Sequence, residues 1–146
     1  MRPSLIIKKN VLFQASTDQV WDLLTNPTLT KQYMFGCEVL SDWRVGSTVN
    51  WEGQTEIGQP ITYVTGKVTE VIIGEKVAFT MFDPNAGFAD IPENYAHLTY
   101  QIATTKNGTL LTLIQGYFAE GENAQQRYEE SLQGWDMVID SMQAII

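Results

Sequence analysis

The sequence predicts an α+β fold, in which an antiparallel sheet of about six to seven strands packs with a long C-terminal helix. Strand-like runs fill residues 37–118, two short helical patterns follow a first strand, and residues 131–146 have helical periodicity. Strands in one block, with helices grouped on one face, are typical of α+β proteins. A chain of 146 residues can bury a sizeable core, so we expect one domain over residues 1–146.

The first predicted elements are a strand and a capped helix. Residues 5–14, LIIKKNVLFQ, are rich in β-prone side chains. Ser16 is then a suitable N-cap, and Gln19 three residues later completes a capping box. The apolar stripe of the helix follows at helical spacing and consists of Val20, Leu23 and Leu24.

A second short helix is predicted directly after the first. Asn26 precedes Pro27, and proline is favoured at the first helical position because its missing N–H has no intrahelical partner there. The helix is expected to run through LTKQY toward Phe35 and Gly36. Both helices therefore precede the main block of strands.

Six further strands are predicted between residues 37 and 118, separated by turn-forming residues. Their sequences are CEVLSDW, STVNWEG, PITYVTGKVTEVII, KVAFTMF, YAHLTYQIATT and TLLTLIQGYF. Gly66 lies inside the longest strand and indicates a bend or bulge. Tight turns are predicted at Gly74-Glu75 and at Lys106-Asn107-Gly108, and residues 83–94 are predicted to be a loop.

The two-residue period of a strand sorts these side chains into faces. The predicted inward sets are Val77, Phe79 and Met81, then Leu98, Tyr100 and Ile102, then Leu111, Leu113 and Gln115. A two-residue turn at Gly74-Glu75 would place Glu70 beside them, with Val68 and Ile72. A bulge near Gly66 or Val71 would reverse that parity, so an outward Glu70 remains the alternative.

The last helix combines a long apolar face with an interior glycine. The face consists of Ala124, Tyr128, Trp135, Val138, Met142 and Ile145, flanked by Leu132 and Ile139. Gly134 costs roughly 1 kcal/mol relative to alanine in a helix interior. We expect its missing side chain to let a strand or loop approach the helix, while Trp135 fills or lines a wider gap. Together with Trp51, Phe79 and Tyr100, that ring forms either a dry core or a ligand chamber.

Charge and composition exclude several classes of protein. The net charge is −8 and only 9 residues are Lys or Arg, so binding to nucleic acids or anionic membranes is not expected. No run approaches the ~20 apolar residues of a membrane span, and the start of the chain does not resemble a signal peptide. Cys37 is the single cysteine, so no intrachain disulfide is possible. A cytoplasmic protein is expected.

The residues that carry metal or catalytic chemistry form no known pattern. One His and one Cys cannot make the usual zinc site, and the loop carboxylates Asp83, Asp90 and Glu93 lack calcium-loop spacing, so they are predicted to be solvated. His97 alternates with the inward residues and is predicted to lie on the surface, and Cys37 is predicted to be an inert thiol. No GxSxG or phosphate-binding loop is present, so we predict no metal, cofactor or catalytic set.

Several short motifs, in order along residues 11–142, resemble those of the SRPBCC superfamily. They are VWDLLTNP (20–27), WRVG (43–46), GKVTEV with EKVAFT (66–71 and 75–80), GTLLTL (108–113) and GW (134–135). The chain is most similar to the bacterial branch that resembles the activator of heat-shock-protein ATPase. It departs from the common pattern at Tyr33-Met34-Phe35, where a tryptophan pair is frequent, and in the loop 83–94, and the resemblance implies that both segments border the mouth of a cavity.

The resemblance implies a helix-grip fold, in which a curved sheet wraps the long C-terminal helix around an apolar cavity. It also implies relatives that transfer lipids, bind plant hormones or cyclise polyketides.

We therefore predict a non-catalytic or weakly catalytic binder of a small apolar or amphipathic molecule, acting as a monomer or homodimer. Two alternatives remain: a chaperone partner or other protein-interaction module, and a cyclase- or hydrolase-like enzyme using Glu70, Tyr100 or Gln115. The predicted ligand-binding residues are Trp51, Glu70, Phe79, Met81, Tyr100, Leu113, Gln115, Trp135 and Met142.

Overall fold

The computed structural model describes residues 5–116 and 124–146 and confirms the α+β class. Within these residues, seven strands form one antiparallel sheet in the order β1-β7-β6-β5-β4-β3-β2. The strands are β1 (Ile7–Phe13), β2 (Glu38–Ser41), β3 (Thr48–Gln54), β4 (Pro60–Ile72), β5 (Lys76–Met81), β6 (Ala96–Thr105) and β7 (Gly108–Gly116). The helices are α1 (Thr17–Thr25), α2 (Pro27–Tyr33), the short 3₁₀ helix η1 (Pro92–Asn94) and α3 (Ala124–Ile145).

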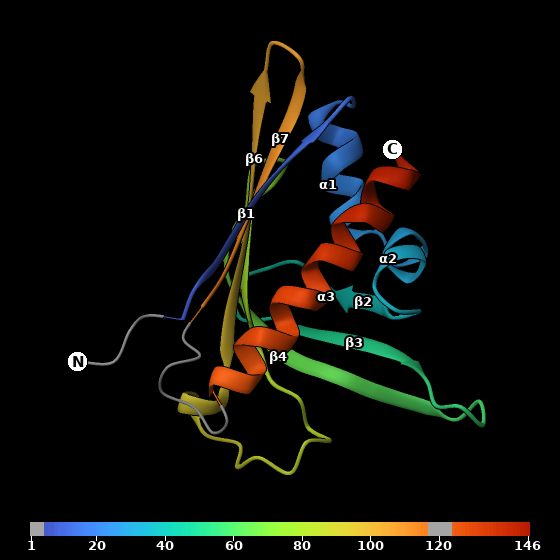
Figure 1. Cartoon of the computed structure of the whole chain (residues 1–146), viewed down its shortest axis with the longest axis vertical. Helices are drawn as coiled ribbons and strands as arrows, with labels where there is room; N and C mark the ends of the chain where they lie inside the picture. The colour runs from blue at the N-terminus through green and yellow to red at the C-terminus, as the bar shows by residue number, and fades with distance from the viewer. Residues whose placement is uncertain (1–4, 117–123) are drawn as a thin grey trace.

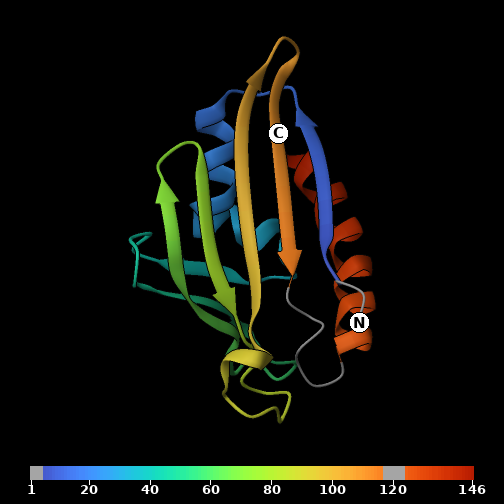
Figure 2. The ribbon, with the colours of Figure 1, turned by 90° about the vertical axis from the view of Figure 1, so that its left-hand side faces the viewer.

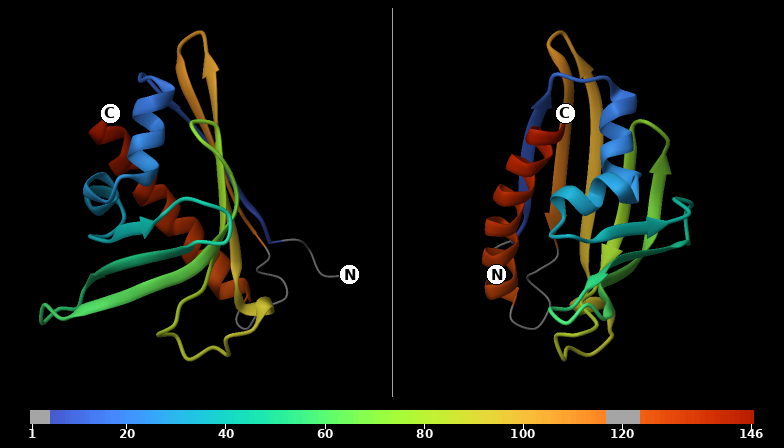
Figure 3. Two further views of the ribbon diagram at one scale, coloured as in Figure 1. Left: turned by 180° about the vertical axis from the view of Figure 1, so that it is seen from behind. Right: turned by 90° about the vertical axis from the view of Figure 1, so that its right-hand side faces the viewer.

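The sheet is strongly bent, and the α-helices lie on its concave side (Figure 1). The strands β3 and β4 project away from β1, β6 and β7, and α3 runs diagonally through the angle between these two parts. Figure 2 shows the opposite face of the sheet, with α1, α2 and α3 behind it. From the helical side, α2 packs beside α3 above β2 (Figure 3). This is the helix-grip arrangement that the motifs predict.

The two short helices begin at the predicted caps. The Ser16 hydroxyl accepts a hydrogen bond from the Gln19 N–H at 3.2 Å, and the Gln19 side chain accepts one from the Ser16 N–H at 2.9 Å. The Asn26 side chain accepts a bond from the Thr28 N–H at 3.0 Å, with Pro27 in the first position of α2. No helix within the described ranges is long and apolar enough to cross a membrane.

The β4–β5 turn differs from the prediction, and this decides where Glu70 points. Ile72 pairs with Lys76, so the turn has three residues, 73–75, rather than two. A bulge between Val68 and Glu70 then returns Val68 to the inner face opposite Phe79. Glu70 lies on the outer face, where its side chain is 49% exposed and pairs with Lys76 at 3.1 Å. The inward placement of Glu70 is therefore wrong.

The other predicted turns and ends have mixed outcomes. The hairpin at Asn107 is confirmed, with Thr105 opposite Gly108, so its loop holds two residues rather than three. The predicted loop 83–94 ends in η1, which the sequence did not indicate. The predicted end of the last strand at 117–118 and the predicted helix start at 119–123 lie outside the described residues.

The core lies between the concave face and the helices. The predicted inward strand residues Val77, Leu98, Leu111 and Leu113 are all fully buried. From α1 the predicted stripe of Val20, Leu23 and Leu24 joins them, and α3 contributes Trp135, Val138 and Met142. The remaining residues of the predicted α3 face pack around this core with partial exposure.

Candidate functional site

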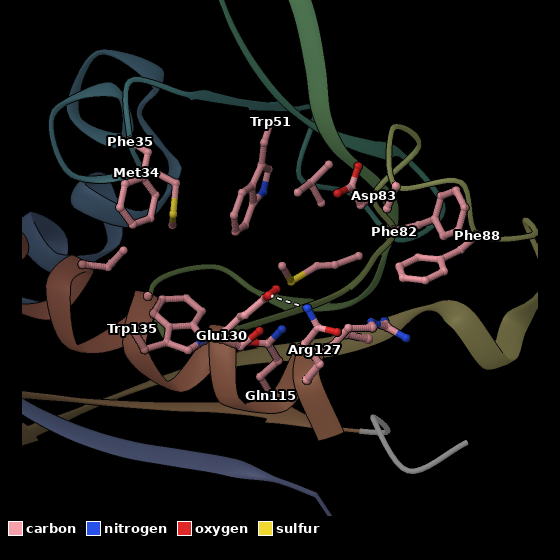
Figure 4. A pocket seen from close by; sticks show the side chains of 18 residues that line it. Met34, Phe35, Trp51, Phe82, Asp83, Phe88, Gln115, Arg127, Glu130 and Trp135 are labelled. Atoms are coloured by element: carbon pink, nitrogen blue, oxygen red, sulfur yellow. Dashed lines mark hydrogen bonds between the residues drawn. The ribbon is translucent and has the colours of Figure 1, made fainter. Parts of the chain in front are cut away.

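A pocket of about 490 Å³ lies between α3 and the bent part of the sheet (Figure 4). Its walls come from the N-terminal and middle parts of α3, from β3 to β7, from the residues after α2, and from the loop that follows β5. The lining is mainly apolar and aromatic, with a few polar side chains. Concave sites of this composition are typical of small-molecule binding.

The predicted ligand-binding residues divide into three groups. Trp51, Met81, Gln115 and Trp135 line the pocket. Four others are buried in the core and do not line it, namely Phe79, Tyr100, Leu113 and Met142. Glu70 lies on the outer face, as described above. The structure therefore brings together about half of the predicted set.

The sequence left open whether the aromatic rings form a dry core or line a ligand chamber. In the structure, some of the rings pack in the core and others line the pocket. Trp43, Phe79, Tyr100 and Trp135 contact one another edge to face in that order, with ring centroids 6.1–6.2 Å apart. Burial raises the pKa of Tyr100, which keeps its phenol protonated. Trp135 ends this row and faces the pocket, so it is the boundary between packed rings and open space.

Gly134 lies beside Trp135 in the pocket wall. A Cβ atom built on this glycine would have no atom within 4 Å, apart from its own helix backbone and chain neighbours. The expectation that a strand or loop approaches the helix here is therefore wrong. The space next to Gly134 belongs to the pocket.

A buried hydrogen bond fixes the polar group on the pocket floor. Trp135 Nε1 donates to Gln115 Oε1 at 2.5 Å, and Gln115 is only 4% exposed. The indole N–H can only donate, so the amide oxygen must face it. The amide nitrogen of Gln115 is therefore directed away from Trp135, and no hydrogen bond joins it to any residue in the described ranges.

The opposite wall carries a second unpaired donor. Trp51 Nε1 is buried and has no hydrogen-bond partner among the described residues. Figure 4 shows the Trp51 ring hanging from β3 on the side of the pocket that faces Gln115 and Trp135. Buried donors normally have partners, so the unpaired N–H of Trp51 calls for an explanation.

Charged residues gather where α3 meets the loop after β5. Arg127 Nη2 donates to the Asn94 carbonyl at 3.1 Å, and its guanidinium lies 5.4 Å from the Phe88 ring centre. Burial lowers the pKa of Arg127, while the charge of Asp83 acts in the opposite direction. Glu130, one turn along α3, accepts a bond from Gln126. Asp83 and Glu130 are exposed, so the acidic groups lie toward water.

The resemblance implied that residues 33–35 and 83–94 border the cavity, and Met34, Phe35 and Phe88 do line the pocket. Sequence reasoning missed the contributions of Phe82 and Arg127. One signal was available on α3, where Arg127, Glu130, Ser131 and Gly134 follow helical spacing beside the predicted apolar face.

His97, Cys37 and the loop carboxylates lie in the settings that the sequence predicts. His97 is exposed and alternates with the inward Leu98, and desolvation lowers its pKa. Cys37 is buried, and burial raises the pKa of its thiol, which disfavours the reactive thiolate. The loop carboxylates Asp83, Asp90 and Glu93 are exposed. No group of three or more His, Cys, Asp or Glu within residues 5–116 and 124–146 has a metal-binding arrangement.

Solved structures with the same fold come from several bacteria. A Cytophaga hutchinsonii protein is 27% identical, with a TM-score of 0.79 and coverage of 99% of this chain and 95% of its own. A Chromobacterium violaceum protein is 22% identical, with a TM-score of 0.76 and coverage of 97% and 96%. A Mycobacterium smegmatis protein is 19% identical, with a TM-score of 0.75 and coverage of 97% and 90%. Among curated proteins, no significant match to the chain was found.

The family comparison agrees with the motifs and the fold. The family model described as "Activator of Hsp90 ATPase homolog 1-like protein" matches residues 14–146, which is nearly the whole chain. The bent antiparallel sheet around α3 is the arrangement that the SRPBCC motifs predict. The chain therefore belongs to the family of activator of Hsp90 ATPase homolog 1-like proteins, within the SRPBCC superfamily.

Proposed function

We propose that this protein binds a small apolar or amphipathic molecule in the pocket between α3 and the bent sheet. The observation that carries the proposal is the open space beside Gly134. A glycine at this point of a 22-residue helix weakens the helix without improving the packing of the protein itself. A bound molecule that occupies the space beside Gly134 would explain why a glycine stands at this position.

The pocket wall supports the same function. Trp51, Met81 and Trp135 offer large apolar surfaces, whereas the Gln115 amide is a single polar group among them. Apolar walls supply binding energy through desolvation, and isolated polar groups orient the ligand. No cysteine, histidine or buried carboxylate lies among the described lining residues, Ser131 is the one lining hydroxyl among them, and Asp83 and Glu130 are exposed.

Filling the space beside Gly134 tests the proposal. The probe is N-phenyl-1-naphthylamine, a neutral compound whose fluorescence rises in apolar surroundings. We expect it to bind the native protein at one site, and Gly134→Leu to weaken binding by about tenfold or more, equivalent to 1.4 kcal/mol. Leucine is a good helix former, so the fold should persist, and circular dichroism would verify this.

The matched control places the same side chain elsewhere on α3. Gln133 is exposed and does not line the pocket, so Gln133→Leu should leave probe binding unchanged. Equal binding by the native protein and Gly134→Leu would contradict the proposal. So would equal weakening by both leucine variants, because the effect would then not depend on the pocket.

The family description favours a second candidate, a protein that acts on a chaperone. Apolar side chains are exposed at two hairpin turns, with Ile57 79% and Ile73 81% exposed. The test is the ATPase rate of a bacterial Hsp90 with and without this protein. A rise that Ile73→Asp abolishes and Gly134→Leu leaves intact would favour this candidate over small-molecule binding.

The enzymatic alternative loses its proposed base. Glu70 was the candidate, and it lies on the outer face paired with Lys76. Tyr100 is buried under Trp135 and does not line the pocket. Of the three residues named for catalysis, only Gln115 lines the pocket, and an amide is not a general base.

A further inference from the structure

We infer that the ligand is an uncharged apolar molecule carrying a carbonyl-type oxygen, which accepts a hydrogen bond from the Gln115 amide nitrogen. This inference rests on the proposed binding function and specifies the class of molecule. It follows from the direction of the unpaired hydrogen-bonding groups in the pocket and from the charges around them.

The orientation of Gln115 is determined by its neighbour. Trp135 Nε1 has no acceptor capacity, so the 2.5 Å contact must be to the amide oxygen. Gln115 is 4% exposed, and its nitrogen has no partner among the described residues. This nitrogen is not among the fully buried, unpaired side-chain atoms, so it keeps accessible surface from which it can donate to a ligand oxygen.

Trp51 adds a second donor of the same kind. Its Nε1 atom is buried and also unpaired within the described part of the chain. Gln115 and Trp51 lie on facing walls of the pocket (Figure 4), and both offer N–H groups. A ligand with an acceptor oxygen pairs with the accessible Gln115 nitrogen, whereas a hydrocarbon leaves it unpaired. An alcohol also brings its own O–H donor, which neither nitrogen can accept. The Trp51 nitrogen has no accessible surface, so it could reach a ligand only after a shift of its ring.

The charges favour a neutral acceptor over a carboxylate. Among the described lining residues, Asp83 and Glu130 outnumber the one cation, Arg127. That cation is already engaged by Phe88 and the Asn94 carbonyl. The chain as a whole carries a charge of −8, which also disfavours an anionic ligand.

Three compounds with the same ring system separate these possibilities: fluorene has no acceptor, 9-fluorenone has a neutral carbonyl, and fluorene-9-carboxylate has a charged acceptor. Each is titrated against the native protein by calorimetry. We expect fluorenone to bind about tenfold more tightly than fluorene, equivalent to 1.4 kcal/mol, and more tightly than the carboxylate. Tightest binding by the carboxylate would overturn the neutral assignment.

Paired variants locate the donor. Gln115→Met combined with Trp135→Phe replaces both partners of the buried hydrogen bond by apolar groups, so that neither is left unpaired. Trp135→Phe alone keeps the amide and is the matched control. The quantity compared is the ratio of the fluorenone and fluorene affinities. In Trp135→Phe we expect fluorenone to bind more tightly than fluorene. In the double variant we expect the two compounds to bind about equally. If the double variant keeps the same preference for fluorenone as the control, the assignment of Gln115 as the donor is overturned.

The outcomes distinguish this inference from the function on which it rests. If fluorene and fluorenone bind the native protein equally and Gly134→Leu blocks both, the carbonyl inference is wrong and the binding function stands. If none of the three compounds nor N-phenyl-1-naphthylamine binds, both are overturned.

Discussion

Single residues in this protein show how one contact can fix the chemistry of its neighbour. An isolated glutamine can present either end of its amide to a pocket. Gln115 cannot, because the indole of Trp135 requires an acceptor and the short contact provides it. The polar character of the pocket floor, a donor rather than an acceptor, is thus decided by a tryptophan on a different element.

The hydrogen bond between Tyr95 and Asp90 leads to a prediction about pH dependence. The Tyr95 hydroxyl donates to Asp90 at 2.6 Å, and this bond, followed by burial and the Asp90 charge, raises the pKa of Tyr95 to about 12. The pKa of Tyr95 in the folded protein lies above the ordinary tyrosine value of 10.0. Its contribution to the stability of the fold is therefore complete below pH 10 and is lost as the pH rises through 12. Asp90→Asn should move this phenol to a lower pKa.

The measurement is an ultraviolet titration of tyrosinate absorbance. In the native protein one phenol should ionise near pH 12, and that step should be missing in Tyr95→Phe. If Asp90→Asn leaves the step at the same pH, the hydrogen bond to Asp90 is not the main cause of the raised pKa.

At the scale of elements, two adjacent faces of α3 have different roles. One face packs Trp135, Val138 and Met142 against the sheet. The neighbouring face carries Arg127, Glu130 and Gly134 into the pocket wall. The glycine lies at the boundary, so the loss of helix propensity is confined to the position where space is needed.

Two glycines, one in α3 and one in β4, should respond in opposite ways to the same substitution. Gly134→Ala adds a methyl group in open space and should stabilise the protein by about 0.5–1 kcal/mol. Gly66→Ala should destabilise it by about 1–3 kcal/mol, because the added Cβ would overlap the Thr80 carbonyl in the adjacent strand. Denaturant unfolding of both variants measures these changes. Destabilisation by Gly134→Ala would show that the space is not available.

For the whole molecule, the bend of the sheet creates the site. The register shifts at Trp51 and near Val68 lie in β3 and β4, the strands that turn away from β1, β6 and β7. A straight sheet would lie flat against α3 and close the space. The bent sheet contacts the C-terminal part of α3 and leaves the pocket along its middle and N-terminal part.

Ligand binding should therefore stabilise the entire fold. At a ligand concentration 100 times Kd, stabilisation is about 2.7 kcal/mol. For a chain of this size that corresponds to a rise in Tm of roughly 5–10 °C. A thermal scan with 9-fluorenone should show this rise in the native protein and a much smaller one in Gly134→Leu. Equal rises in both would place the binding outside the pocket.

The predictions that succeeded depend on local patterns. The capping box at Ser16, the proline start of α2 and the Asn107 hairpin each follow from a few adjacent residues. The inward face of β6 and β7, including Gln115, follows from the strand period. Glu70 was placed on the wrong face because its parity depends on a three-residue turn and a bulge, and the period itself reveals neither.

The order of the elements, the starts of α1 and α2 and most of the inward side chains can be read from the sequence, because these follow from short-range periodicity and capping. Three features required the folded structure: Gly134 faces open space, the amide nitrogen of Gln115 is unpaired, and Arg127 borders the pocket. These features depend on how far α3 stands from a bent sheet. That distance is set by register shifts and packing between segments far apart in the chain.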